Sequence, residues 1–546
     1  MKRFVVIVCS LLFIAISAAE KPLLRAGLIT DTHVTPDIKS VEKLRAAFEL
    51  FKRERVDMVI NLGDVADKFH PQAYRHYRNT VKSVYPDGIR EIIAYANHDQ
   101  VSAVKNLASP VPYPMLKAAL EISHDPEALE VVNGFPFVIF SQQFKSLELY
   151  EQHLSDAAKK FPGRPLFVIE HRPPCYSTFC DSGIDGKVKI LEKFPQIIHL
   201  SGHIHGDIRN ERLFWQGAYT AVNLGCLKGW GGALEGTIPF YKRSSGVLIM
   251  EVYKNKVIFR RMDCLLNRTV AEPWIVALPY QPQEPQKVFE ERKKASVTPQ
   301  FPAGSKIRLS ADKPFNELKI SFSAALPQKD VYKYEIFIKD KVDGKLLNRQ
   351  EIFGDFYRDD PVKNCGHTIS AGYFESQKEY IIEVIPFNFF GKRGNALRGS
   401  FKAPDKLKWQ TVFECREPMK TLKFREGLEN GRDMKLKNGF YIHDVEIARL
   451  IFPENAWSGK AGSRYRFTID MHTRQSGIRK WTLVLRNTAC VSNARPRLYT
   501  QNGDLGVRRY VIEFVKPADD YSYYLLIREG DMGEIRFDYV KIERLD

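Results

Sequence analysis

The stretch LLRAGLITDTH, residues 23–33, places a short apolar run directly before an aspartate and a histidine. The run over residues 23–30 has the length and composition of a strand buried in a sheet. Apolar residues at helical spacing follow over residues 41–51, with Ser40 as the expected N-cap. The stretch therefore predicts one strand–helix unit, with polar side chains where the strand ends.

The same arrangement recurs along the first half of the chain. A helical pattern over residues 147–154 separates two of the further apolar runs. Strands that alternate with helices predict an α/β layer fold with much parallel sheet. The expected strands after the first cover residues 58–62, 92–96, 137–140, 166–169 and 197–200.

The pattern changes near residue 270. Six prolines punctuate the polar stretch 269–303, which we predict to be a linker. Beyond it, apolar and polar residues alternate, as in 334–339, which is followed by the hairpin turn signal Asp343-Gly344. We predict two all-β sandwich domains. Residues 304–404 resemble a fibronectin type III module, and residues 405–546 resemble the jelly-roll modules of secreted enzymes, some of which bind carbohydrate.

The N-terminus has the pattern of a secretory signal. Lys2 and Arg3 precede an apolar or small run over residues 4–19 that ends in Ser17-Ala18-Ala19. This run is shorter than the ~20 residues needed to span a bilayer, and no later segment is long and apolar enough. We expect residues 1–19 to be removed and the protein to be exported, periplasmic or extracellular, without a transmembrane segment.

Charge and cysteine content narrow the function classes. The formal net charge is +17, but the basic residues are scattered, so no specific nucleic-acid binding is expected. Seven cysteines remain after removal of the signal. This odd number leaves at least one of them unpaired, and their density is far below that of a disulfide scaffold. Cys175 and Cys180 share one short loop and could pair.

Five short polar groups each follow an expected strand, and ten of the thirteen histidines lie at or before His205. Because ligands bind beyond the carboxyl ends of strands in open α/β sheets, we expect these groups to share one crevice. Their mixture of Asp, Asn and His without thiolate suits Zn, Mn or Fe. The groups are Asp31-Thr32-His33, Gly63-Asp64-Val65-Ala66-Asp67, Asn97-His98-Asp99, His171-Arg172-Pro173 and Gly202-His203-Ile204-His205.

The spacing within two of these groups suggests how a metal is reached. Asp31 and His33 are two residues apart, and so are His203 and His205. In extended backbone, such pairs point to the same face, so each pair is expected to reach one metal region. Glycines 63 and 202 are expected to permit close backbone approach at the strand ends.

In this order, the five groups resemble the signature of calcineurin-like metallophosphoesterases: D-x-H, G-D-x-x-D, G-N-H-D/E, a single His and G-H-x-H. The resemblance covers about residues 23–265. It implies a four-layer α/β sandwich of two mixed sheets flanked by helices, which we assign to a catalytic domain over residues 20–268. It also implies a centre of two divalent or trivalent metal ions, Mn, Fe or Zn, and a phosphate-ester substrate.

The resemblance also implies a role for each matching residue. Asp64 bridges the two ions. Asn97 is expected both to bind a metal and to contact the substrate. His98 is expected to act as general acid or as a hydrogen-bond donor to the phosphate, and Asp99 is expected to orient the imidazole of His98. Asp67 is expected to hydrogen-bond outside the ligand set. The other ligands are Asp31, His33 and His205 for one ion and Asn97, His171 and His203 for the other.

Two departures from the family pattern matter. Ala96 stands where the family usually has glycine, which predicts a loss of backbone freedom in that loop. The purple acid phosphatase branch has glycine at the place of His33 and tyrosine at the place of Asp67, so no tyrosinate-bound iron is expected.

Taken together, these features predict a secreted enzyme that hydrolyses phosphate mono- or diesters by attack of a hydroxide held between the two metals. Arg172 is expected to bind the phosphate, with a surface ion pair as the alternative. Tyr176, Lys228 and Trp230 follow site strands, and Lys228-Gly229-Trp230-Gly231-Gly232 is expected to form a substrate rim. The alternative is a surface or glycan-binding protein whose C-terminal sandwiches have the main role. In that case Trp457 and Tyr499 are candidates for stacking on sugars or on another cell-surface ligand.

Overall fold

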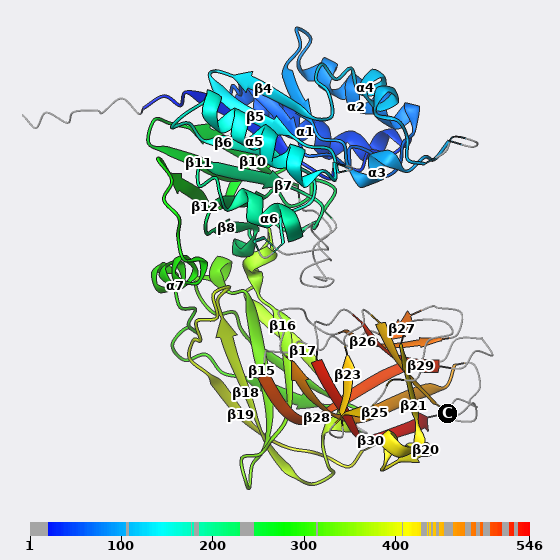
Figure 1. Cartoon of the computed structure of the whole chain (residues 1–546). Helices are drawn as coiled ribbons and strands as arrows, with labels where there is room; N and C mark the ends of the chain where they lie inside the picture. The colour runs from blue at the N-terminus through cyan, green and yellow to red at the C-terminus, as the bar shows by residue number, and fades with distance from the viewer. Residues whose placement is uncertain are drawn as a thin grey trace, which may run out of the picture. The chain divides into compact units, whose positions relative to one another are not determined.

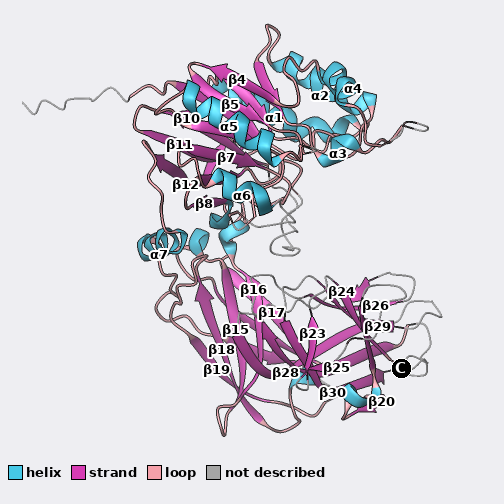
Figure 2. Cartoon of the chain, in the orientation of Figure 1, coloured by secondary structure: helices cyan, strands magenta, loops and turns pink. Residues whose placement is uncertain are grey.

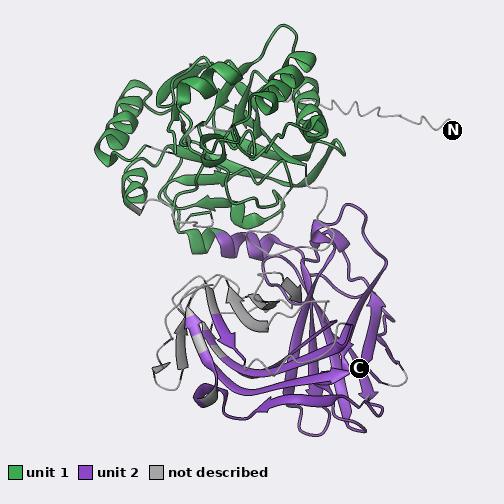
Figure 3. Cartoon of the chain, turned by 90° about the vertical axis from the view of Figure 1, so that its right-hand side faces the viewer, with its two compact units in different colours: residues 1–234, 242–288 green, residues 235–241, 289–546 purple. Residues whose placement is uncertain are grey.

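The computed structural model of the chain is shown in Figure 1. It divides into two compact units, residues 1–234 with 242–288 and residues 235–241 with 289–546 (Figure 3). Residues 1–19, Tyr176, Cys180, Trp230, Trp457 and Tyr499 lie outside the described part of the chain. The structure describes residues 20–104, 107, 109–142, 144–175, 177–178, 185–229, 245–312, 315–406, 408–426, 434, 436–437, 440–443, 447–452, 462–475, 482–487, 492–494, 503–515, 523–528 and 533–545.

The first unit contains two mixed sheets, as predicted. Their strand orders are β12-β11-β10-β1-β2-β3 and β4-β5-β6-β7-β9-β8. The pairs β1–β2 and β2–β3 are parallel, and so are β5–β6, β6–β7 and β7–β9. The strands are β1 (Leu24–Ile29), β2 (Met58–Asn61), β3 (Arg90–Ile93), β4 (Ala128–Val132), β5 (Phe135–Ile139), β6 (Leu166–Ile169), β7 (Ile197–Ser201), β8 (Phe214–Gln216), β9 (Thr220–Asn223), β10 (Gly246–Val252), β11 (Lys256–Asp263) and β12 (Arg268–Ala277).

Helices cover the outer faces of both sheets, which completes the predicted four layers (Figure 2). One core joins the inner faces, with Leu28 and Ile60 from the first sheet and Ile169 from the second. Phe48 of α1 packs with the outer face of the first sheet, and Tyr150 of α5 with that of the second. The helices are α1 (Glu42–Arg53), α2 (Pro71–Val84), α3 (Asn97–Gln100), α4 (Tyr113–Leu120), α5 (Leu147–Lys160) and α6 (Asp185–Leu191).

The expected N-cap at Ser40 is wrong. A 3-10 turn over Ile38–Val41 precedes α1, so Val41 occupies the cap position and forms no side-chain cap. The Ser40 hydroxyl instead accepts from the Thr35 N–H (3.0 Å) and donates to the Asp37 carbonyl (2.7 Å). The helix therefore begins two residues after the serine, because the loop before it uses that hydroxyl.

The stretch predicted as a linker contains two regular elements, so that prediction is wrong for much of 269–303. Strand β12 pairs antiparallel with β11, and helix α7 (Pro285–Ala295) follows. Pro273 lies within β12, which is the edge strand of its sheet. A proline is tolerated there because no further strand needs its missing N–H.

The second unit is rich in antiparallel strands, which agrees with the predicted β-sandwiches. The hairpin predicted at Asp343-Gly344 joins β15 to β16, and Gly344 has φ +71°. Sheets β13-β14-β17 and β16-β15-β18-β19 share one core. Their strands are β13 (Arg308–Ala311), β14 (Glu317–Ser323), β15 (Lys333–Asp340), β16 (Leu346–Phe353), β17 (Asn364–Ser370), β18 (Glu379–Phe387) and β19 (Leu397–Lys402).

Two more antiparallel sheets follow, with orders β22-β23-β30-β25-β28, to which β20 adds on β30, and β21-β24-β29-β26-β27. Among the described residues, no helix is both long and apolar enough to cross a membrane. The remaining elements are β20 (Gln410–Cys415), α8 (Pro418–Thr421), β21 (Lys423–Glu426), β22 (Leu436–Lys437), β23 (Phe440–His443), β24 (Ile447–Ile451), β25 (Arg464–Gln475), β26 (Thr482–Asn487), β27 (Ser492–Ala494), β28 (Gly503–Val515), β29 (Tyr523–Arg528) and β30 (Gly533–Leu545).

Candidate metal centre

The polar groups that follow β1, β2, β3, β6 and β7 come together at the carboxyl ends of these strands. Two sets of ligand atoms, each within 4.8 Å of one another, have Asp64 in common. Asp64 is thus placed where one carboxylate reaches two neighbouring sites. The first set consists of Asp31, His33, Asp64 and His205, and the second of Asp64, His171 and His203.

Four buried atoms at this place have the character of metal ligands. Asp31 Oδ1, Asp64 Oδ2, Asn97 Oδ1 and His171 Nε2 are shielded from solvent and form no hydrogen bond. Burying such groups without a partner is costly, and a cation would supply the missing partner for all four. The donor set of carboxylate, amide and imidazole fits Mn, Fe or Zn. The side chains therefore fit the metal centre that the resemblance implies.

The backbone at the ligands is left-handed rather than extended. The φ angles are +50° at Asp31, +44° at His33 and +50° at Asp64. His203 and His205 have φ of +73° and +48°. The expectation that each two-residue pair points together because its backbone is extended is therefore wrong. Such non-glycine conformations cost about 1–3 kcal/mol each and cluster at functional sites.

Hydrogen bonds from the protein leave one oxygen of each carboxylate for a metal. Asp31 Oδ2 accepts from the Thr30 hydroxyl (2.7 Å) and the His203 N–H (2.9 Å), while Oδ1 lies 3.0 Å from His205 Nε2. Asp64 Oδ1 accepts from the His98 N–H (2.8 Å), while Oδ2 lies 3.1 Å from His171 Nε2. The oxygens facing the imidazoles are those that lack hydrogen bonds.

The imidazole of His171 is held in the orientation a metal ligand needs. Its Nδ1 lies 2.8 Å from the Leu62 carbonyl oxygen. Since a carbonyl only accepts, Nδ1 carries the hydrogen, and Nε2 is the nitrogen presented to the centre. A backbone partner of this kind fixes both the tautomer and the ring plane.

Asp67 binds a ligand side chain from outside, as expected. Its Oδ1 lies 2.8 Å from His33 Nδ1 and 2.6 Å from Lys228 Nζ. Burial would raise the pKa of Asp67, but the hydrogen bonds from His33 and Lys228 outweigh it and lower that pKa to about 2. Asp67 therefore orients His33, so that Nε2 faces the centre. The rim residue Lys228 contributes to the same arrangement.

Asp99 does not orient His98, so that prediction is wrong. His98 Nδ1 lies 2.7 Å from the Asp67 carbonyl oxygen. The Asp99 carboxylate instead accepts from the Tyr74 hydroxyl (2.9 Å) and the N–H groups of Val65 (3.4 Å) and Ala66 (3.3 Å). Successive residues of a helix do not face each other, so Asp99 points away from His98 and into the 64–67 loop.

The environment of Asp99 differs from that of the ligand carboxylates. Burial and the nearby charge of Asp64 raise the pKa of Asp99 to about 7. For Asp31, burial acts in the same direction, but the close imidazoles of His205 and His33 outweigh it and hold its pKa well below the usual value. The same carboxylates raise the pKa of His33 and His171 to about 9 against the opposing effect of burial.

The two glycines permit the close approach that was predicted for them. A Cβ at Gly202 would lie 2.0 Å from Thr30 Oγ1, and a Cβ at Gly63 would lie 2.4 Å from the Ala96 methyl group. Ala96 itself has φ −116° and ψ 176°, which any residue adopts. The alanine therefore costs no backbone freedom, contrary to expectation, and its methyl fills the space that Gly63 leaves.

Two asparagines that were not predicted as site residues stabilise the strand ends. Asn61 Oδ1 accepts from the Gly63 N–H, and Asn223 Oδ1 accepts from the Gly225 N–H, both at 3.1 Å. Asn223 also donates to the Gly202 carbonyl (2.6 Å). A signal was available, because the tripeptide Asn-Leu-Gly occurs at both places, residues 61–63 and 223–225.

The remaining predicted site residues lie beside the centre. Arg172 directly follows His171 and is half-buried, and Asn97 opens α3 with His98 next to it. Their contacts with a substrate stay predictions. The Cys175–Cys180 disulfide also stays a prediction, because Cys180 lies outside the described residues.

The family comparison agrees with this geometry. Residues 24–207 match the family model of calcineurin-like phosphoesterase. This part of the chain is a calcineurin-like phosphoesterase domain, the domain of metal-dependent phosphoric ester hydrolases. No curated protein matches the sequence at a significant level.

Solved structures resemble parts of the chain. A predicted phosphoesterase from Streptococcus pneumoniae has 13% identity and a TM-score of 0.23, and the match covers 46% of this chain and 97% of that one. A purple acid phosphatase from yellow lupin has 12% identity and a TM-score of 0.34, with 46% and 53% covered. Vacuolar Protein Sorting 29 from Cryptosporidium parvum has 12% identity and a TM-score of 0.23, with 47% and 98% covered. The assignment rests on the family model and not on these likenesses.

Proposed function

We propose that the protein is an exported enzyme that hydrolyses phosphate mono- or diesters with two metal ions that share Asp64. The observation that supports this proposal most strongly is the position of Asp64 in both sets of ligand atoms. Its orphaned Oδ2 and the orphaned Oδ1 of Asp31 show that these carboxylates have unused ligand capacity. Asp31, His33 and His205 would hold one ion, and Asn97, His171 and His203 the other.

Bound metal ions would activate the attacking water and stabilise the negative charge of the transition state. Two ions lower the pKa of a water molecule towards ~7 and neutralise the charge that develops on the phosphoryl oxygens. Among the predicted ligands, Asp31 and Asp64 are negatively charged. The other ligand side chains are neutral when their imidazoles are deprotonated. Mn, Zn and Fe all accept this kind of donor set.

His98 is the residue we assign to the leaving group. Its Nδ1 faces the Asp67 carbonyl and therefore carries a hydrogen. The other nitrogen, Nε2, is then the one that can exchange a proton with the substrate. A protonated His98 would donate from Nε2 to the oxygen of the departing alcohol, which leaves with that proton, and the neutral ring would take a new proton from solvent. Arg172 is assigned to a non-bridging phosphoryl oxygen, which its guanidinium fork suits.

Export rests on the N-terminal sequence alone. The basic start and the apolar run over residues 4–19 form a cleavable signal. Mass spectrometry of the mature protein is expected to find Glu20 as the first residue. An intact Met1 in the mature protein would contradict export through this signal.

The enzymatic proposal is tested by metal removal and refilling. The purified mature chain is stripped with a chelator, refilled separately with Mn, Zn or Fe, and assayed with 4-nitrophenyl phosphate and bis(4-nitrophenyl) phosphate. Activity should vanish on stripping and return on refilling, and the better ester decides between mono- and diester. Absence of metal binding would contradict the site.

Glycan binding by residues 405–546 stays a prediction. Trp457 and Tyr499, the two aromatic residues named for it, lie outside the described residues. The esterase is supported independently, by the family match over residues 24–207 and by the two sets of ligand atoms.

A further inference from the structure

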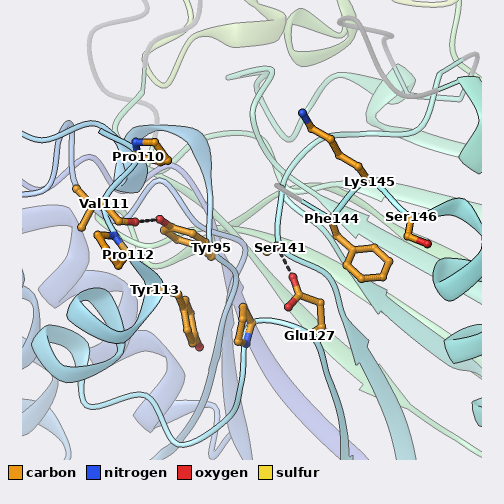
Figure 4. Close-up of a pocket in the computed structure, with 11 residues that line it drawn as sticks. Tyr95, Pro110, Val111, Pro112, Tyr113, Glu127, Ser141, Phe144, Lys145 and Ser146 are labelled. Atoms are coloured by element: carbon orange, nitrogen blue, oxygen red, sulfur yellow. Dashed lines mark hydrogen bonds between the residues drawn. The ribbon is translucent and has the colours of Figure 1, made fainter. Parts of the chain in front are cut away.

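A cavity of about 550 Å³ lies in the first unit (Figure 4). Small-molecule sites in proteins have volumes of about 300–1,000 Å³, so this cavity is large enough for an organic group and much larger than a phosphate needs. None of its lining residues belongs to the predicted ligand set. Its lining includes Tyr95, Tyr113, Glu127, Ser141, Phe144 and Lys145.

One wall of the cavity is connected through the backbone to the segment that carries Asn97 and His98. Tyr95 follows β3 and precedes Asn97 by two residues. The 110–113 wall is fixed to α3, because the Val111 N–H donates to the Gln100 carbonyl (2.9 Å). The same short helix therefore presents Asn97 and His98 at one end and supports a cavity wall at the other.

The opposite wall is joined to the strand that precedes His171. Phe140 N–H donates to the carbonyl of Ile169, the last residue of β6 (3.0 Å). The Gln142 N–H donates to the Tyr95 carbonyl (3.1 Å), which holds the two walls together. Both walls therefore belong to loops that follow the carboxyl ends of β3 and β5, the kind of strand end at which the predicted ligands also lie.

The lining combines aromatic rings with a carboxylate. In Figure 4, Tyr95 and Tyr113 lie on one side, and Phe144 and Glu127 on the other. The two tyrosine hydroxyls are used within the protein, since Tyr95 donates to the Val111 carbonyl and Tyr113 to the His124 carbonyl (3.1 Å). What these residues offer a ligand is therefore their rings.

Glu127 supplies an acceptor between these rings. Its Oε1 accepts from the Ser141 hydroxyl. Its Oε2 receives no hydrogen bond from the residues that the structure describes. Carboxylates of this kind bind the hydroxyls of ribose in nucleotide sites, and aromatic rings stack on bases. Lys145 lies exposed at the rim, where its charge favours an anionic ligand.

We propose that this cavity binds the nucleoside part of a nucleotide whose phosphate ester lies at the metal centre. The inference rests on the proposed function, since it assigns the leaving group of the same reaction. The base lies between the aromatic walls, a ribose hydroxyl donates to Glu127, and His98 faces the ester oxygen. Hydrolysis of such a substrate releases the nucleoside into the cavity and phosphate at the metals.

The first test compares two substrates and two cavity variants. The ratio of kcat/KM for adenosine 5′-monophosphate to that for 4-nitrophenyl phosphate is measured with the metal-loaded mature chain. Glu127→Gln and Tyr113→Leu should each lower this ratio by about tenfold, mainly through the KM of the nucleotide. The matched control is Glu148→Gln, an exposed residue of α5 outside the cavity lining, which should leave the ratio unchanged. A ratio that does not change in either cavity variant would overturn the proposal.

The second test does not depend on activity. Binding of adenosine and uridine to the metal-free protein is measured by calorimetry, with thermal melting to show that each variant is folded. Binding to the wild type that weakens about tenfold in Tyr113→Leu supports the assignment, even if no ester is hydrolysed. Hydrolysis of 4-nitrophenyl phosphate without binding of either nucleoside would overturn the nucleoside assignment and leave the proposed function standing. Absence of both would contradict the two proposals separately.

Discussion

The predicted ligand side chains of the first unit and Arg466 of the second unit are all buried, but their polar atoms differ in their partners. At the strand ends of the first unit, Asp31 Oδ1, Asp64 Oδ2 and His171 Nε2 are buried without a hydrogen bond. In the second unit, the Arg466 side chain is equally buried, at 3% exposure, but it donates to Glu513 (2.7 Å) and Asn316 (3.3 Å). Its guanidinium also lies 4.2 Å from the centre of the Trp409 ring.

This difference separates a site from a structural contact. A buried charge is tolerated when it is paired, and Arg466 is paired on several sides. Asp31 and Asp64 each keep an oxygen without a hydrogen bond, and these oxygens face the imidazoles of His205 and His171. Backbone strain also differs between the two units. Five predicted ligands of the first unit have positive φ. Among the described residues of the second unit, Gln377 is the one non-glycine residue with positive φ. Strain and unsatisfied polarity together identify the ligand-binding region.

The largest effect is expected from Asp64→Asn. The amide keeps the shape of the side chain but removes the charge shared by both ligand sets. We expect kcat for 4-nitrophenyl phosphate to fall by at least about 10³-fold. Asp87→Asn, at an exposed turn, is the matched control and should retain full activity. Near-normal turnover in a metal-loaded Asp64→Asn protein would refute the site.

Arg466→Met tests the other half of the comparison. It leaves Glu513, whose side chain is 16% exposed, without its closest cation. We expect the free energy of unfolding of the second unit to fall by about 3 kcal/mol, with no change in hydrolysis. Arg416→Met is the control, because the Arg416 side chain is 83% exposed, and a change below about 1 kcal/mol is expected. Denaturant unfolding measures the free energy of unfolding of both variants. Equal losses in Arg466→Met and Arg416→Met would contradict the distinction between buried paired charges and exposed ones.

Gly63→Ala tests whether the close approach at the ligand loop is required. The position has φ +97°, and a Cβ would lie 2.4 Å from the Ala96 methyl group. We expect a loss of about 3 kcal/mol in stability together with weaker metal binding. Gly134→Ala, with φ +77° and nothing within 4 Å of the new Cβ, should cost about 1–2 kcal/mol from backbone strain alone.

A double variant sharpens this result. Ala96→Gly combined with Gly63→Ala removes the overlap between the two methyl groups and leaves the backbone strain. Part of the lost stability should therefore return. If the double variant is no more stable than Gly63→Ala, the contact with Ala96 does not determine the geometry of the loop.

The metal affinity is also expected to depend on pH. In the metal-free protein the pKa values of His33 and His171 are about 9, above the ordinary value of 6.5. These imidazoles are therefore protonated at pH 7 and must release protons to bind a metal. Affinity should rise by about tenfold per pH unit for each proton released between pH 7 and 9. Competition with a chromogenic chelator measures it, and a pH-independent affinity would contradict the arrangement.

The stability of the metal-free protein should change in the opposite direction. A histidine whose pKa is higher in the folded state stabilises the fold fully below pH 6.5, and this contribution is lost as pH rises through about 9. The metal-loaded protein should not show this loss.

Much of the first unit could be predicted because its strands are simple apolar runs. The run over residues 166–169 corresponds residue for residue to β6, and residues 58–62 to β2 with one residue added. Strand β12 was missed because Pro273 and the neighbouring polar residues are typical of a linker. An edge strand tolerates both, and only the pairing with β11 distinguishes the two cases.

The identity of the ligands could be predicted from the sequence, but their backbone could not. The motif order gave Asp31, His33 and the other ligands, while the left-handed φ angles depend on tertiary contacts such as the bond from His203 N–H to Asp31. The direction of Asp99 was also unpredictable, because it depends on the distant partner Tyr74. Sequence motifs predict which residues form a site, whereas tertiary packing determines the direction of each side chain.

Counting the bound ions shows whether two metals share Asp64. The stripped mature chain is refilled with Mn, and its metal content is measured by elemental analysis together with its electron paramagnetic resonance spectrum. We predict two Mn ions per chain with the spectrum of an exchange-coupled pair, which Asp64→Asn abolishes. One ion per chain, or two ions with uncoupled spectra that persist in Asp64→Asn, would contradict the shared carboxylate.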